Sequence, residues 1–415
     1  MPTVLVIGYV WPEPNSSAAG KRMLQLLEYF TRSNYKVIFA TTAALSNNAA
    51  NLIELGISSV KIELNNRSFD TYIQDLLPEI VLFDRFMMEE QFGWRVSKNS
   101  PNSIKILDTE DLHFLRNSRE QQLSSNVSFF NSELAKREIA SIYRCDLSLI
   151  ISEVEMKLLK EEFNISEKLL IYVPFMLNPI TKSETDLLPS FEERKNFISI
   201  GNFKHKPNVD AVRFLKKEIW PIIKKELPEV EMHIYGAYPT GAVTQLSNPK
   251  ERFLVKGWAQ NAEEVVKHSK VSLAALRFGA GLKGKLTEAM QQGTPTVTSS
   301  LGAEGMHGEL PWNGFIKDDP KAFAEAAIKL YTDSSIWETS QNNGFTIINE
   351  RYNKAYFYKM LDKKLAFLRE KLSNHREANF IGSMLQYHRV KSTQHLSKYI
   401  EVKMELEALK ASIKE

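Results

Sequence analysis

The residue types best suited to binding a phosphorylated ligand lie together in one stretch of the chain, residues 277–299. Its glycines, among them Gly279 and Gly281, carry no side chain and let the backbone approach a ligand closely. Lys283 and Lys285 follow, and their positive charge suits a diphosphate. A helix is predicted to begin here, and the amides at a helix N-terminus attract anions. The stretch therefore predicts a phosphate-binding loop.

Glu288 falls one turn into that predicted helix, and Arg277 opens the stretch. A carboxylate at this place can accept hydrogen bonds from the two hydroxyl groups of a ribose. A glycine loop alone would be explained more simply as a turn with surface lysines. Two lysines, a helix and a glutamate at these spacings favour a nucleotide site instead.

The elements that must position this loop are strands and helices that alternate along the chain in two series. Buried parallel strands read as continuous apolar runs, and strand–helix alternation is typical of a doubly wound sheet. The first series of expected strands comprises Thr3–Ile7, Lys36–Ala40, Val60–Leu64, Glu79–Phe83, Ile104–Leu107, Leu147–Ile151 and Leu169–Val173. The second comprises Phe197–Ile200, Glu231–Tyr235, Phe253–Val255, Val271–Leu276, Thr296–Ser299 and Phe315–Ile316. Expected helices include Gly20–Thr31, Phe129–Ile142, Asp210–Lys225 and Leu286–Gln292.

This pattern predicts an α/β protein with two Rossmann-like domains that face a cleft, followed by a C-terminal helical extension. A polar, turn-rich stretch at residues 178–186 separates the two series. We expect the first domain over residues 1–178, the second over residues 190–352, and C-terminal helices with a basic tail over residues 353–415. Ligands of such sheets bind at the carboxyl ends of the strands, so the cleft is the expected site.

The glycine-loop segment resembles the donor-site segment of family 4 glycosyltransferases. The resemblance rests on the pattern Gly-x-Gly-x-Lys-x-Lys-x-x-Glu-Ala-Met-x-x-Gly-x-Pro-x-Val, which runs from Gly279 to Val297. Residues 302–306 and 201–211 are also similar to that family. In the N-terminal half the likeness is weaker and is confined to residues 12–22, 108–116 and 145–155.

The resemblance implies a GT-B fold and a nucleoside-diphosphate sugar as donor substrate, with no bound metal or cofactor. It implies a hexosyltransferase that moves a sugar to a glycan, lipid-linked or natural-product acceptor with retention of configuration, as part of polysaccharide biosynthesis. The donor-binding residues it implies are Gly201, Asn202, Lys204, Lys206, Arg277, Gly279, Gly281, Lys283, Lys285, Glu288 and Glu304.

Two departures from the family pattern bear on the donor. Many members have two glutamates eight residues apart, but Ala280 stands where the first is expected. Many also carry an arginine and a lysine for the diphosphate after the first strand of the second domain, where this chain has Asn202 and Asn208. Lys204, Lys206 or the loop lysines must then supply that charge.

Candidate catalytic residues are His113, Glu110 and Glu288. Family members often have a catalytic-site histidine just before an aspartate. This chain has Glu110 before Asp111, with His113 shortly after. The expected acceptor-side residues are Gly20, Arg22, Asp84 and Arg85. A salt bridge that only fixes the loop is an equally good interpretation of the last two.

Two other functions stay open: a non-catalytic GT-B scaffold that uses its tail for interactions, and a nucleotide-sugar 2-epimerase. The missing first glutamate and the long tail favour the scaffold, whereas the family segments fit an epimerase poorly. No nucleic-acid partner is expected, because no basic segment is interleaved with aromatic residues in a known module. The sequence does not name the donor sugar, the base, the acceptor, the linkage or the oligomeric state.

A cytoplasmic protein is expected, since the single cysteine, Cys145, excludes an internal disulfide and the N-terminus resembles no secretory signal. Residues 361–415 hold 11 Lys and Arg against 7 Asp and Glu. Their role is open between packing on the protein or a second copy and peripheral contact with the inner face of the membrane. One predicted helical face there carries Phe380, Ile381, Met384, Leu385 and His388, flanked by Arg376, Arg389 and Lys391.

Overall fold

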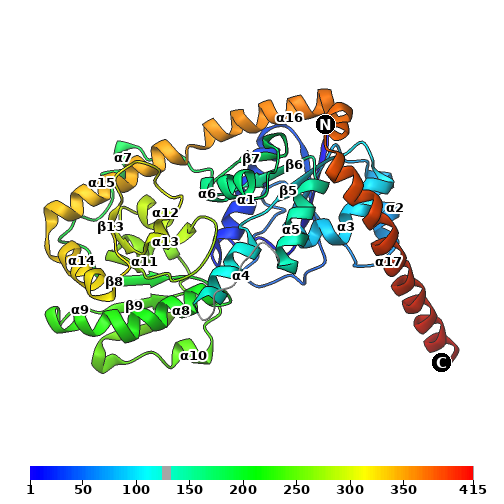
Figure 1. The fold of residues 1–415 in the computed structure, drawn as a ribbon. Helices are drawn as coiled ribbons and strands as arrows, with labels where there is room; N and C mark the ends of the chain where they lie inside the picture. The colour runs from blue at the N-terminus through cyan, green and yellow to red at the C-terminus, as the bar shows by residue number, and fades with distance from the viewer. Residues whose placement is uncertain (124–131, 415) are drawn as a thin grey trace.

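The computed structural model of the protein describes residues 1–123 and 132–414. It contains two parallel β-sheets, each with helices on both faces (Figure 1). Within the described residues, the N-terminal sheet has seven strands in the order β3-β2-β1-β4-β5-β6-β7. They are β1 Thr3–Gly8, β2 Lys36–Thr41, β3 Ser58–Lys61, β4 Ile80–Asp84, β5 Ile104–Asp108, β6 Leu147–Ile150 and β7 Leu170–Tyr172.

The C-terminal sheet has, over the same described ranges, six strands in the order β10-β9-β8-β11-β12-β13. They are β8 Lys195–Ile200, β9 Met232–Tyr235, β10 Phe253–Gly257, β11 Ser269–Ala274, β12 Thr296–Thr298 and β13 Gly314–Ile316. Neighbouring strands of both sheets pair in parallel. The GT-B class predicted from the sequence is thereby confirmed.

The helices that cover the N-terminal sheet are α1 Ala18–Arg32, α2 Ser68–Leu76, α3 Phe86–Asn99, α4 His113–Gln122, α5 Glu133–Arg144 and α6 Glu153–Glu161. Those of the second half are α7 Lys182–Thr185, α8 Lys206–Phe214, α9 Trp220–Glu226, α10 Gly241–Thr244, α11 Ala262–Lys267, α12 Gly284–Gln291, α13 Ser300–Ala303, α14 Pro320–Thr332 and α15 Ser334–Arg351. The last two are α16 Lys354–Glu377 and α17 Phe380–Lys414. The helix expected from Phe129 is found as α5, and its first expected residues lie outside the described part of the chain.

Each expected strand is found in the structure. The strands could be recognised from their apolar runs because helices cover both faces of these sheets. Val4, Leu5, Val6 and Ile7 of β1 are all buried, so the strand carries apolar residues on both faces. Such a strand shows no alternation in its sequence and is recognised by its continuous apolar run. The boundaries shift by a few residues, as for β11, which ends two residues before the expected run does.

Helix α16 begins the helical extension that the sequence predicts, and it returns to the N-terminal domain and completes its core (Figure 1). Phe357, Leu361, Leu365 and Leu368 lie on one face of α16 and are buried with the strands of the first sheet. Burying one such side chain contributes about 1.5–3 kcal/mol to stability, so the packing of this face holds α16 against the first domain. The sequence predicts C-terminal helices from residue 353 onward but does not specify which domain this helix covers.

Helix α17 contacts α3 and α5 through its polar face and turns its apolar face to solvent. Gly382, Ser397 and Glu401 are buried, and the Glu401 carboxylate pairs with Arg95. By contrast, Phe380 is 74% exposed and Ile381 45% exposed. Phe380, Ile381 and Met384 of the predicted apolar face are therefore exposed, whereas Leu385 is half-buried. The side chains of His388, Arg389 and Lys391 lie outside the described part.

Arg376, predicted to flank that apolar face as a free cation, instead joins the tail to the N-terminal domain. Its guanidinium donates to both carboxylate oxygens of Asp146, each at 2.7 Å, and to the carbonyl oxygen of Ser103 at 2.7 Å. The Asp146 side chain is buried, so this ion pair is structural.

Across the described ranges, no helix combines the length and the apolar character needed to cross a membrane.

Candidate active site

The two sheets reverse their strand order at equivalent places, and a cavity lies between them. The reversal falls between β1 and β4 in the first sheet and between β8 and β11 in the second. Ligands of doubly wound sheets bind at the carboxyl ends of the strands at such a reversal. The cavity has a volume of about 650 Å³ and is lined by residues of both domains, a size that suits a small-molecule ligand.

On the C-terminal side, the cavity wall is the loop between β11 and α12. A Cβ atom at Gly281 would lie 2.8 Å from the Cβ of Asp111, and one at Gly284 would lie 2.5 Å from the Cβ of Ala18. Asp111 and Ala18 belong to the first domain. These glycines therefore allow the first domain to approach the loop closely, just as they would allow a ligand to approach it.

Lys283 and Lys285 both line the cavity, as the sequence predicts. Lys285 Nζ donates to Asn208 Oδ1 at 2.7 Å, and Lys283 Nζ donates to the carbonyl oxygen of Gly281 at 2.7 Å. Burial lowers the pKa of each lysine to about 8. Both lysines are partly neutral near that pH, and a bound anion would restore their full charge.

Glu288 also lines the cavity, and one of its oxygens has no partner. Its Oε2 lies 3.2 Å from Lys21 Nζ, which comes from α1 of the other domain. Its Oε1 is buried without a hydrogen-bond partner among the described residues. Burial raises the pKa of Glu288, and Lys21 opposes that rise. A buried acceptor without a donor is costly, so a ligand hydroxyl is a fitting partner for Oε1.

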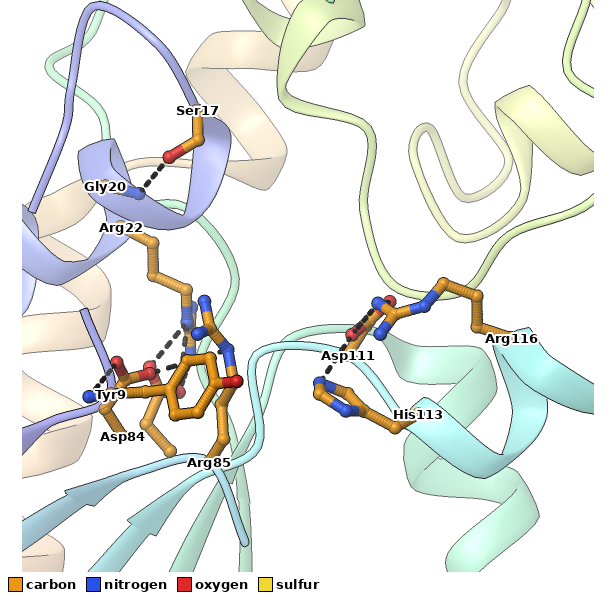
Figure 2. A network of polar contacts seen from close by, with 10 residues as sticks. Tyr9, Ser17, Gly20, Arg22, Asp84, Arg85, Asp111, His113 and Arg116 are labelled. Atoms are coloured by element: carbon orange, nitrogen blue, oxygen red, sulfur yellow. Dashed lines mark hydrogen bonds and ion pairs between the residues drawn. The ribbon is translucent and has the colours of Figure 1, made fainter. Parts of the chain in front are cut away.

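The N-terminal wall is formed where β1, β4 and β5 end, and its polar network is seen in Figure 2. The backbone amide of Tyr9 donates to Asp84 Oδ2 at 2.9 Å, and the Arg85 guanidinium lies 5.2 Å from the centre of the Tyr9 ring. Arg85 and Glu110 both have positive φ angles, of 70° and 62°. Such backbone costs about 1–3 kcal/mol for a residue other than glycine and is concentrated at functional sites.

His113 is the first residue of α4, and its ring faces Asp111 and Arg116 (Figure 2). His113 Nε2 lies 3.5 Å from Asp111 Oδ1, and Arg116 Nη1 donates to the same oxygen at 2.6 Å. Burial lowers the pKa of His113 to about 4, so its imidazole is neutral at pH 7. Burial and the nearby Asp108 raise the pKa of Glu110 to about 8, so this carboxyl is protonated at pH 7. Each can therefore donate a hydrogen bond to a sugar hydroxyl without carrying charge.

Arg22 was expected on the acceptor side, but it is wholly buried behind the cavity wall. Its guanidinium donates to Asp108 Oδ1 at 2.8 Å and to the carbonyl oxygens of Val173 and Pro174 at 2.6 and 3.1 Å. The other expected acceptor-side residues, Gly20, Asp84 and Arg85, do line the cavity.

The predicted donor-binding residues are not all brought together. Gly201, Asn202, Lys204 and Gly279 line the cavity with the residues described above. Lys206, Arg277 and Glu304 do not: each forms an ion pair outside it. Their partners are Glu120 at 2.8 Å, Asp210 at 2.8 Å and Arg119 at 2.7 Å, respectively.

Two residues that assemble the cleft were not among the predicted site residues, although Glu155 lies in the family-like segment 145–155. Arg119 forms two hydrogen bonds with Glu304 and a third, at 2.9 Å, with the carbonyl oxygen of Gly279. Glu155 Oε1 accepts from the backbone amide of Gly281 at 2.8 Å. Both residues join α-helices of the first domain to the glycine loop of the second. No local pattern marks such pairs, because the partners are more than a hundred residues apart.

Residues 194–333 match the sequence model of the family described as Glycosyl transferases group 1. This part of the chain is therefore similar to group 1 glycosyltransferase domains. It contains the strands and loops that form the second wall of the cavity, including the lysines and Glu288. The family 4 resemblance is therefore supported at the level of group 1.

Comparisons over longer stretches give one relative of low identity and several solved structures with the same fold. A protein described as an uncharacterized 44.6 kDa protein in the cps region of Klebsiella pneumoniae is 22% identical over 310 residues, which cover 68% of this chain and 74% of that protein. Sucrose-phosphate synthase from Thermosynechococcus elongatus is 13% identical and superimposes over 89% of this chain and 99% of its own, with a TM-score of 0.66. Anabaena HepE, solved with UDP and glucose, is 12% identical over 88% of this chain and all of its own, with a TM-score of 0.64. These structural likenesses identify the fold as GT-B.

Proposed function

We propose that the protein is a glycosyltransferase that moves a sugar from a nucleoside-diphosphate sugar to an acceptor held at the N-terminal wall of the cleft. The observation that carries the proposal is the unpartnered, buried Oε1 of Glu288 beside two buried lysines and a glycine loop. That combination offers an acceptor for ribose hydroxyls and donors for a diphosphate within one cavity. The UDP and glucose bound to HepE support the same class of donor.

The diphosphate would lie at the N-terminus of α12. The N-cap residue, Lys283, makes no side-chain capping hydrogen bond there, which leaves amides of the first turn available. Lys285 approaches from the same helix, and its position against Asn208 places its charge at the end of β8. Helix amides and lysines together stabilise the charge of a leaving diphosphate.

The acceptor and the transferred sugar would meet between the glycine loop and the strand ends of the first domain. Arg85, Tyr9 and the neutral His113 line this part of the cavity. We further propose a family 4 type of hexosyl transfer with retention, to a glycan, lipid-linked or natural-product acceptor. The cps region named for the Klebsiella relative supports a role in polysaccharide biosynthesis.

The second candidate function, a GT-B scaffold without catalysis, is favoured by one observation. Ala280, which stands where many family members have a glutamate, packs with apolar residues of the first domain. A test for hydrolysis of nucleotide sugars by the purified protein separates the two, because a scaffold without catalysis would release no sugar.

A thermal-shift screen with UDP, GDP and ADP and their glucose conjugates tests donor binding. One nucleotide series is expected to raise the Tm, because a ligand that binds only the folded state adds about 2.7 kcal/mol at a hundredfold excess over its Kd. Glucose 1-phosphate, which lacks the nucleoside, is the matched control. Unchanged melting with every nucleotide would contradict the proposal.

Replacing both Lys283 and Lys285 by alanine is expected to weaken nucleoside-diphosphate binding and to make the remaining binding less sensitive to salt. Since the pKa of each lysine is about 8, wild-type affinity should fall as the pH rises above 8, by up to tenfold per pH unit for each proton lost. The measurement is calorimetric titration between pH 7 and 9.5. The exposed Lys182 and Lys321, replaced together by alanine, provide a control with the same loss of charge. An affinity that stays constant over this range would contradict the assigned roles.

A cytoplasmic location, and a contact of the tail with a membrane surface or a second copy, stay proposals. The tail contact is supported by the exposed apolar residues of α17, which include Tyr399 at 67% and Leu396 at 61%. Removing the chain after residue 374 would not test them cleanly. It would also remove Arg376 and expose the buried Asp146 carboxylate.

A further inference from the structure

Lys21 and Glu288 form an ion pair that spans the cleft. Lys21 belongs to α1 of the N-terminal domain and Glu288 to α12 of the C-terminal domain, and their charged atoms are 3.2 Å apart. The pair sits where the two helices begin side by side, since Ala18 of α1 and Gly284 of α12 are in close contact. The Glu288 side chain is 13% exposed and the Lys21 side chain 34%, so the carboxylate is the better shielded partner of this pair.

Of the charged groups around Glu288, Lys21 is the one that favours its ionised form. Glu263, from α11, is a like charge and disfavours it, as burial does. Lys285 is on the same helix as Glu288, but its ammonium is engaged with Asn208. Lys21 pairs with one carboxylate oxygen, and the other, Oε1, has no partner within the described ranges 1–123 and 132–414.

We infer that Lys21 is a positioning residue for the nucleoside: across the cleft, it holds Glu288 ionised and oriented so that the free Oε1 can accept from ribose hydroxyls. This inference rests on the proposed function. It means that the ribose site is complete only when the two domains are as close as they are here. The N-terminal domain would then contribute to donor binding through a residue that need not touch the donor.

Loss of the Lys21 charge has a predictable consequence for pH dependence. The pKa of Glu288 is already raised by burial, and without the opposing lysine it rises further. A protonated carboxyl has lost acceptor capacity, so nucleotide affinity falls as the pH is lowered through this pKa. The acid limb of the binding profile is the range in which nucleotide affinity falls as the pH is lowered. This limb should therefore lie at higher pH in a variant that lacks the Lys21 ammonium.

The test is calorimetric titration of UDP into the full chain from pH 5 to pH 7.5, for the wild type, Lys21→Met, Lys21→Gln and Lys21→Arg. We expect the acid limb to move to higher pH in Lys21→Met and Lys21→Gln, so that both variants lose affinity on that limb relative to the wild type. Lys21→Arg keeps the charge and should stay close to the wild type. Lys98→Met, an exposed lysine of the same domain, is the control for loss of one positive charge. Circular dichroism and the Tm establish that each variant is folded.

Different results would contradict the proposed function and the inference about Lys21. If the wild type does not bind UDP, GDP and ADP take its place as probes, and binding of none overturns the proposed function along with this inference. If the wild type binds a nucleotide and the Met and Gln variants show the wild-type profile, the inference about Lys21 alone is overturned. An equal loss of affinity at every pH would also overturn it, because a purely structural role of Lys21 gives that result.

Discussion

Replacing Glu288 by alanine is expected to weaken nucleoside-diphosphate binding about tenfold to a hundredfold while the protein still folds. The lost interaction is a charge-assisted hydrogen bond to ribose, worth roughly 1.5–3 kcal/mol. Folding should survive because, among the residues that the structure describes, one carboxylate oxygen has no protein partner to lose and the other pairs with the partly exposed Lys21. Calorimetric titration and the rate of sugar transfer measure the two consequences.

Two further variants sharpen that experiment. Glu288→Gln keeps an oxygen acceptor but not the charge, so its affinity should fall between those of the wild type and the alanine variant. Glu263→Ala removes a carboxylate from neighbouring α11, outside the cavity lining, and should bind at least as tightly as the wild type. Equal affinity of wild type and Glu288→Ala would show that Glu288 does not contact the ribose.

Replacing Arg22 by methionine is expected to destabilise the N-terminal domain by about 3–5 kcal/mol. Breaking a buried pair from one side has this cost because the remaining charge is left without compensation. Here the Asp108 carboxylate would be left with no exposure to solvent, and the carbonyl oxygens of Val173 and Pro174 would lose their donor. Urea denaturation followed by near-UV circular dichroism measures the free energy of unfolding.

Matched variants separate burial from charge. Arg22→Met combined with Asp108→Asn should recover part of the lost stability, because no uncompensated charge remains. The exposed pair of Lys182 and Asp186 is the control, and its removal should change stability by less than about 1 kcal/mol. If Arg22→Met unfolded at the same urea concentration as the wild type, the Arg22–Asp108 pair would not contribute to the fold.

Much of the fold is predictable because parallel strands covered on both faces must be apolar throughout. The run from Thr3 to Ile7 is recognised for this reason, and so is the mostly apolar run Val271–Leu276 of the second sheet. The role of α16 was not predicted. Its buried face is plain in the spacing of Phe357, Leu361, Leu365 and Leu368, but an amphipathic helix does not specify which sheet it covers.

Some residues of the candidate site are likewise predictable from the local sequence, and others are not. The glycine loop, Lys283, Lys285 and Glu288 are close in sequence, so their spacing and the expected helix already place them in one cavity. Of the charged residues that were predicted one by one, some line the cavity and others do not. Lys206 and Glu304 lie outside the cavity because each has an acidic or basic partner from the first domain, about 90 and 185 residues away.

What the sequence determined by itself is the GT-B class and the donor-side loop, because both depend on local patterns of apolar, glycine and charged residues. What only the tertiary structure decided is the partner of each charged group. Arg22 could have lined the cleft but is buried against Asp108, and Lys21, its neighbour in the chain, reaches Glu288 across the domains. A charge selects its partner by distance and burial, and both are set by how the two domains fold against each other.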